Sequence, residues 1–151
     1  RELVEPLRAY AASKRPFLGI CLGMQLMLDS SDELGKTQGL GLIPGRVELM
    51  KADKSAKVPQ IGWNELKFQE KAKILRSLVF ENLEDKAITL YFLHSYIAVL
   101  SDPQYILCET EYGGIRFASA IQKDSIIGFQ PHLERSGAQG LQILKNFVGS
   151  P

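Results

Sequence analysis

The sequence predicts an α/β fold, on three observations. Short apolar runs at residues 17–20 and 126–129 have the composition of strands buried on both faces of a sheet. Residues 2–12 and 140–148 place apolar side chains at helical spacing. Two β-rich stretches joined by a Gly-Gly turn are typical of a hairpin. Helices, parallel-looking buried strands and a hairpin together indicate an α/β domain.

Composition narrows the classes of function. With 45% hydrophobic and 23% charged residues, the 151-residue chain is typical of one globular domain with a sizeable core. A net charge of +1 suggests neither a nucleic acid nor a membrane surface as partner. The two cysteines make no disulfide framework and favour a reducing compartment. Because the chain opens at Arg1, inside a predicted helix, we expect an N-terminally incomplete sequence.

Taken in order, the first helix covers residues 2–12, and the strand at residues 17–20 leads through Cys21 into a second helix. A polar segment at residues 29–35 ends that helix. The apolar face expected for the first helix is formed by Leu3, Val4, Leu7, Tyr10 and Ala11, and the face expected for the second by Leu22, Gln25, Leu26 and Met27.

Strands and turns are expected along the rest of the chain, before a closing helix. The expected elements are a strand near residues 46–50, extended chain at 58–68, a weak helix or turn at 74–80, a β-rich stretch at 89–99, paired strands at 105–110 and 115–121, a buried strand at 126–129 and a helix at 140–148. The closing helix should bury Leu141, Leu144, Phe147 and Val148. No repeat or low-complexity linker divides the chain, so residues 1–151 are expected to form a single domain.

Cys21 lies where the first strand turns into a helix, with Gly19 and Gly23 two residues to either side. A sharp turn of this kind needs small neighbours, and the pattern is that of a nucleophile elbow. The helix N-terminus would lower the pKa of the thiol, and the N–H of Leu22 would point to where an oxyanion forms. A buried, unreactive cysteine fits the same motif, because free cysteine packs like a small hydrophobe.

A cysteine nucleophile needs a base, and the chain has two histidines, His94 and His132. His132 follows a buried strand end, and Glu134 lies two residues on, so in extended chain the two side chains would project to the same side. His94 lies in an aromatic strand, where a hydrogen-bonded structural role is expected. A surface-loop role for His132 is the alternative.

Several motifs in register now resemble one family. Residues 19–25 are similar to the nucleophile motif of class I, triad-type glutamine amidotransferases, and residues 130–137 to their terminal His/Glu motif. Residues 58–64 and 91–96 narrow the resemblance to the glutaminase subunit or domain of imidazole glycerol phosphate synthase, a histidine-biosynthesis enzyme. Residues 39–45 fit the same family.

The resemblance implies a flavodoxin-like, three-layer fold and the hydrolysis of L-glutamine to glutamate and ammonia. The nucleophile would form a glutamyl thioester, the histidine would shuttle protons, and the glutamate would orient the histidine. The residues implied are Cys21, His132 and Glu134 for catalysis, Leu22 for the oxyanion hole, and Gln25, Ser95 and Tyr96 for binding the amino-acid end of the substrate.

The implied partner is a (βα)8-barrel cyclase, as a separate chain or a fused domain, which receives the ammonia. No cofactor or metal, no nucleic acid and no membrane is implied, and the expected compartment is the cytoplasm, or the plastid in a plant. Two alternatives stay open: a non-catalytic amidotransferase-like subunit that binds a synthase, and a thiol hydrolase or peptidase on the same fold.

Two departures from the family pattern stand out. Pro131 precedes the histidine, where the family has an aromatic residue, and Leu133 follows it, where the family has proline. Proline holds Gln130 extended and removes an N–H donor, which could shift His132. The family's first strand–helix units, with a glycine-rich segment that completes the oxyanion hole, have no match in this chain, so we expect the fold without them.

Overall fold

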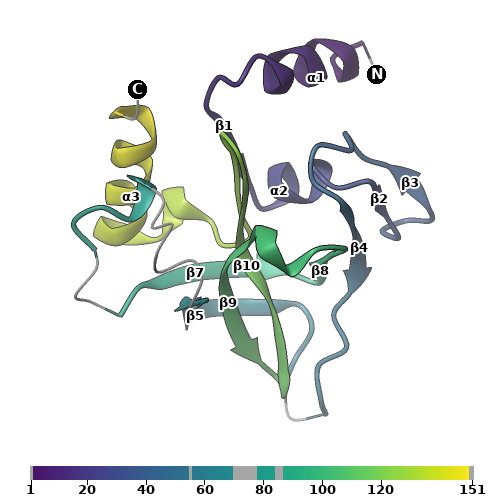
Figure 1. Cartoon of the computed structure of the whole chain (residues 1–151). Coiled ribbons are helices and arrows are strands. Elements are labelled where there is room, and N and C mark those ends of the chain that lie inside the picture. The colour runs from purple at the N-terminus through teal and green to yellow at the C-terminus, as the bar shows by residue number, and fades with distance from the viewer. Residues whose placement is uncertain (1, 55, 70–77, 84–86, 150–151) are drawn as a thin grey trace.

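The computed structural model describes residues 2–54, 56–69, 78–83 and 87–149, and its centre is a mixed β-sheet (Figure 1). The strands run in the order β1 (Phe17–Ile20), β11 (Ile126–Phe129), β10 (Ile115–Lys123), β8 (Tyr96–Leu100), β4 (Gly45–Leu49), β2 (Ser30–Ser31) and β3 (Thr37–Gln38). Two further strands belong to this sheet: β9 (Ile106–Tyr112) pairs with β10, and β6 (Lys67–Phe68) pairs with β9. A separate antiparallel pair is formed by β5 (Gln60–Glu65) and β7 (Thr89–His94).

Helices cover both faces of the β1–β11–β10 part of the sheet (Figure 1). They are α1 (Val4–Ala12) and α2 (Leu22–Leu26) on one side and α3 (Gly137–Gly149) on the other. Short 3-10 turns lie at Leu78–Phe80, Pro103–Tyr105 and Leu133–Arg135. The predicted three-layer α/β arrangement is therefore confirmed. None of the helices in the described ranges is long and apolar enough to span a membrane.

Each face of the sheet has its own hydrophobic core, because successive residues of a strand point to opposite faces. On β10, Phe117 packs in one core and Ala118 in the other. The first core receives Ile143 from α3, and the second receives Met24 from α2 and Ala11 from α1. Burial on both faces explains why the short β11 is apolar throughout.

The parallel pair β1–β11 determines where the candidate site lies. The register joins Phe17 to Ile126 and Ile20 to Phe129, so the two strands end side by side. The next residues along the chain, Cys21 and Gln130, therefore leave the sheet at the same edge. Functional loops of α/β folds are found at this carboxyl edge.

The predicted strands at residues 17–20 and 126–129 are confirmed to the residue. The hairpin is confirmed too: β9 and β10 pair antiparallel through a turn in which both Gly113 and Gly114 have positive φ. A weak helix or turn was expected at residues 74–80. Residues 74–77 lie outside the described part of the chain, and a 3-10 turn covers Leu78–Phe80.

Three predicted helix faces were wrong in part. Within α1 only Ala11 is buried, because only the last turn reaches the core. The inward residues of α2 are Met24 and Gln25, followed by Met27 and Leu28, whereas Leu22 and Leu26 are exposed. In α3 the buried residues are Gly140 and Ile143, with Leu144 and Phe147 partly buried, whereas Leu141 and Val148 are exposed.

Candidate active site

Cys21 occupies the sharp turn between β1 and α2. Its backbone angles are φ 50° and ψ −108°, a region in which a residue with a side chain is strained. The Cys21 N–H donates to the carbonyl of Phe129 at 2.7 Å, which ties the turn to the end of β11. The backbone therefore has the strained strand-to-helix geometry of a nucleophile elbow.

The two glycines beside the elbow have different surroundings. A Cβ on Gly19 would lie 2.6 Å from the backbone carbonyl group of Gly23 and 2.6 Å from Met27 Cε. A Cβ on Gly23 would meet no atom within 4 Å. The expectation that both positions need a small residue is thus correct for Gly19 and wrong for Gly23.

Burial dominates the electrostatics of the thiol. It raises the pKa of Cys21 above its ordinary value, and the charges of Glu134 and Glu33 act in the same direction. Hydrogen bonds from the Leu22 amide and the Gln130 side chain oppose this rise. The prediction that the helix N-terminus would lower the pKa is wrong in its net direction, although the Leu22 amide does act as expected. The resting group is therefore a thiol, which requires a base.

His132 and Glu134 are hydrogen-bonded, with 2.7 Å between His132 Nδ1 and Glu134 Oε1. Since an ionised carboxylate only accepts hydrogen bonds, Nδ1 carries a proton, and in the neutral ring Nε2 is the free base. The two side chains do lie on the same side, as expected, but a 3-10 turn rather than extended chain brings them together. The His132 N–H donates to the carbonyl of Tyr91 at 2.8 Å, which fixes the start of this turn against β7.

Pro131 disturbs none of these contacts. It is buried, and the N–H groups on both sides of it have backbone acceptors: Gln130 donates to Ser119 and His132 to Tyr91. Leu133, the second departure from the family pattern, is fully buried in the core that receives Ile143.

Besides the Leu22 amide, two groups of the described structure form hydrogen bonds with the sulfur of Cys21. Its thiol donates to the carbonyl of Leu93 at 3.8 Å, and Nε2 of Gln130 donates to it at 3.8 Å. Neither contact is with His132. Catalytic hydrogen bonds are often long in the substrate-free state and shorten when substrate binds.

His94 has the structural role expected of it. It is 6% exposed, its Nδ1 donates to the carbonyl of Tyr96 at 2.9 Å, and its ring packs against Phe92 and Phe117. Burial lowers the pKa of His94 to about 4, and the nearby charge of His132 contributes to the lowering. A histidine with so low a pKa stays neutral at physiological pH.

A hollow of about 150 Å³ lies beside the elbow, and Leu22, Gln25 and Glu33 are among the residues that line it. The side-chain amide of Gln25 donates to the carbonyl of Tyr96 at 3.1 Å and to Oε1 of Gln130 at 3.2 Å. The Ser95 carbonyl accepts from the N–H of Met50 at 2.8 Å. Gln25, Ser95 and Tyr96, which are expected to bind substrate, are thus close to one another. Leu22, which is expected in the oxyanion hole, lines the same hollow as Gln25.

Two polar residues of this region were missed in the sequence. Glu33 lies in a polar segment that resembles an ordinary helix exit, and nothing in its spacing points to Cys21. Gln130 lies two residues before His132, which in extended chain puts both on one side, and this was the available signal.

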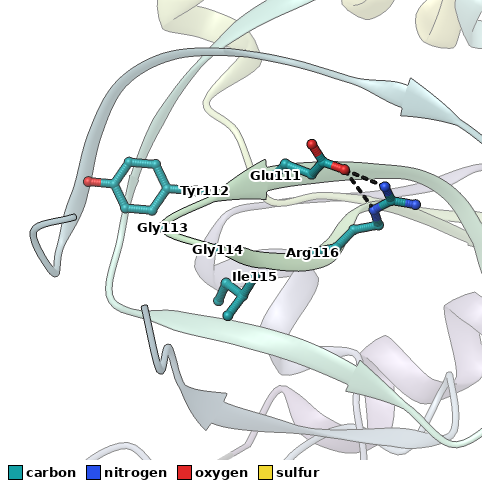
Figure 2. A pocket seen from close by; sticks show the side chains of 6 residues that line it. All are labelled: Glu111, Tyr112, Gly113, Gly114, Ile115 and Arg116. Atoms are coloured by element: carbon teal, nitrogen blue, oxygen red, sulfur yellow. Dashed lines mark hydrogen bonds and ion pairs between the residues drawn. The ribbon is translucent and has the colours of Figure 1, made fainter. Parts of the chain in front are cut away.

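A second hollow, of about 450 Å³, lies at the β9–β10 hairpin and is lined by residues 111–116 (Figure 2). There Glu111 pairs with Arg116 and, at 2.8 Å, with Lys67, and these cations lower the pKa of Glu111. No residue expected in the site lines this hollow. Within the described ranges, no group of three or more His, Cys, Asp and Glu side chains could hold a metal ion.

The class of protein follows from comparison with a family model. The model described as "Glutamine amidotransferase class-I" matches residues 1–150. A glutamine amidotransferase from Thermotoga maritima has a similar fold, with a TM-score of 0.56 at 19% sequence identity over 95% of this chain and 49% of that one.

Curated relatives narrow the class further. Imidazole glycerol phosphate synthase subunit HisH of Sulfurimonas denitrificans is 43% identical over 98% of this chain and 69% of its own length. HisH of Syntrophotalea carbinolica is 40% identical over 95% of this chain and 69% of its own length. The chain therefore belongs to the class I glutamine amidotransferases and, among them, to the family of imidazole glycerol phosphate synthase subunit HisH.

Proposed function

We propose that this protein hydrolyses L-glutamine to glutamate and ammonia, with residues 1–151 acting as one glutaminase domain and Cys21 as the nucleophile. The observation that carries the proposal is the shared sheet edge at which the strained elbow of Cys21 and the His132–Glu134 pair both lie. Membership of the family supports the same reaction.

In the proposed mechanism, Nε2 of His132 takes the proton of the Cys21 thiol as the sulfur attacks the amide carbon. The N–H of Leu22 stabilises the oxyanion of the tetrahedral intermediate. The C–N bond then breaks as His132 returns the proton to the nitrogen, which leaves as ammonia. Water, deprotonated by His132, attacks the resulting thioester, and the C–S bond breaks to release glutamate. His132 then returns the proton to the Cys21 sulfur, which restores the thiol. Glu134 holds the imidazole in the tautomer that both steps need.

The contacts of Gln25 suggest how the amino-acid end of glutamine is held. Both hydrogens of its amide are used within the protein, so its carbonyl oxygen is the group left for substrate. With the carboxylate of Glu33 lining the same hollow, this oxygen would accept from the α-ammonium group. The carbonyls of Ser95 and Tyr96 already accept hydrogen bonds, so these two residues would offer donors to the α-carboxylate.

The proposed partner is a (βα)8-barrel cyclase that uses the ammonia to make imidazole glycerol phosphate, in the cytoplasm. Relatives at about 40% identity are named as subunits of imidazole glycerol phosphate synthase, which supports an assembly with a second subunit. A non-catalytic subunit is the second candidate, and the observation in its favour is that none of the hydrogen bonds of the Cys21 sulfur within the described residues is with His132.

A Cys21→Ala variant in complex with the cyclase tests the proposal. Glutamine-dependent synthesis should fall by at least about a thousandfold, because no nucleophile remains. Synthesis from added ammonium salt should not change, since it bypasses the glutaminase. Cys108→Ala is the matched control: this second thiol is fully buried in the core, and its loss should leave both reactions intact.

Glutamine turnover by purified Cys21→Ala would refute the proposal. A wild-type protein that binds the cyclase yet hydrolyses no glutamine in the complex would establish the non-catalytic alternative.

A further inference from the structure

Two buried side-chain amides, those of Gln25 and Gln130, link the Tyr96 carbonyl to the Cys21 sulfur, and their hydrogen bonds allow only one orientation of each amide. The carbonyl of Tyr96 can only accept, so Gln25 must present its NH2 group to it. The same NH2 group lies 3.2 Å from the Gln130 side chain, which must therefore present its carbonyl oxygen. The NH2 group of Gln130 is then turned toward the Cys21 sulfur, 3.8 Å away.

We propose that Gln130 is a positioning residue for the nucleophile: its amide, oriented by Gln25 and through it by Tyr96, donates to the Cys21 sulfur. The inference rests on the proposed function in one respect, namely that Cys21 is the nucleophile. Gln130 is fully buried, and its own N–H is bonded to the carbonyl of Ser119 at 2.9 Å, so neither its backbone nor its side chain can move freely.

The contacts of the sulfur with Leu93 and with Gln130 favour opposite protonation states. The Leu93 carbonyl can only accept, so it stabilises the thiol. The amide of Gln130 can only donate through its nitrogen, so it stabilises the thiolate, as does the N–H of Leu22. When His132 removes the proton, the contact with Leu93 is lost and the contact with Gln130 strengthens, because a hydrogen bond to an ionised acceptor is stronger.

The charges around the sulfur make this donor important. Glu134 and Glu33 both raise the pKa of Cys21, in addition to burial. Within the described structure, the groups that lower it are the two uncharged donors, Leu22 and Gln130. The Leu22 amide belongs to the backbone and is kept in every substitution except that to proline, whereas a change of side chain removes the Gln130 amide.

The test is the pH profile of Cys21 alkylation by iodoacetamide in the full chain, with the modified cysteine identified by peptide mass spectrometry. Gln130→Leu removes the donor, and Gln130→Glu replaces it with a carboxylate of the same size. Both should move the profile to higher pH and slow alkylation at pH 7 about tenfold or more, as expected for one lost hydrogen bond to a thiolate. Gln122→Leu, which removes a surface amide bonded to the Asp124 carbonyl, should leave the profile unchanged.

A folded Gln130→Leu variant with the wild-type profile would overturn the inference, and thermal melting shows whether it is folded. If Gln130→Leu does not fold, Gln130→Glu and Gln25→Leu decide instead. Gln25→Leu frees Gln130 to rotate, so it should shift the profile in the same direction although Gln25 does not contact the sulfur. Wild-type profiles in both variants would overturn the inference.

Alkylation separates this inference from the proposed function. The Cys21 alkylation profile could shift on substitution of Gln130 in a protein whose complex with the cyclase hydrolyses no glutamine. This result would support the Gln130 contact and refute the proposed function. An active glutaminase whose Cys21 alkylation profile does not change when Gln130 is substituted would overturn the inference and leave the proposed function standing.

Discussion

Gly19 and Gly23 stand at equal distances from Cys21 along the chain, but only Gly19 has another part of the backbone against it. The position of a Cβ on Gly19 is occupied by the carbonyl group of Gly23, which cannot move without opening the elbow. The strain at Cys21 therefore persists because β1, which precedes the turn, packs closely against α2, which follows it.

The two alanine substitutions should consequently differ. Gly19→Ala should destabilise the protein by about 1–3 kcal/mol, as overpacked cores do, and should abolish glutaminase activity. Gly23→Ala should change the free energy of unfolding by no more than about 1 kcal/mol, in the stabilising direction, since alanine favours the helix. Urea unfolding measures both. Equal losses of stability in the two variants would contradict this account of the elbow.

At the scale of elements, β7 brings one residue to the active site and one to the core. The carbonyl of Leu93 contacts the nucleophile, and the next residue, His94, is buried among Phe92 and Phe117. The Nδ1 proton of His94 is used by the Tyr96 carbonyl, and its buried Nε2 has no partner within the described structure. Protonating Nε2 would bury a charge, which explains the lowered pKa.

This burial should make stability depend on pH. Between pH 6.5 and about 4 the unfolded chain binds a proton at His94 and the native protein does not, so stability should fall as pH falls through this window. The full effect is about 3 kcal/mol. Because carboxylates also titrate here, the quantity to measure is the difference between wild type and His94→Asn, which keeps a donor near Nδ1 but cannot titrate.

Urea unfolding at pH 7 and at pH 4 gives that difference. Wild type should lose about 3 kcal/mol more than His94→Asn between these pH values. Parallel losses in the two proteins would show that His94 titrates normally, and that its ring is not buried in solution as it is in this structure.

At the scale of the whole molecule, the features predicted correctly from the sequence are those that depend on the local pattern of residues. Both strands of the parallel pair and the β9–β10 hairpin follow from apolar runs and turn residues. The closeness of His132 and Glu134 was expected from their spacing, although a 3-10 turn and not extended chain produces it. The inward face of α2 could not be predicted in this way, because leucine or methionine lies on every side of so short a helix. Which side is buried depends on the sheet.

The missed parts of the site have the same explanation. Gln130 gains its role from proximity to Cys21, which the sheet creates between segments far apart in sequence. Glu33 acts on the thiol through its charge. The net pKa shift of the thiol depends on burial, a property of the whole fold, so the local helix N-terminus was a poor guide to its sign.

Labelling with 6-diazo-5-oxo-L-norleucine, a glutamine analogue with an electrophilic carbon near the amide position, tests the central claim most directly. In the complex with the cyclase, the analogue should abolish glutaminase activity as one label accumulates on Cys21, with Cys108 unmodified and L-glutamine protecting the site. Inactivation with the label on any other residue, or a fully labelled Cys21 in a protein that still hydrolyses glutamine, would contradict the assignment of Cys21 as the nucleophile.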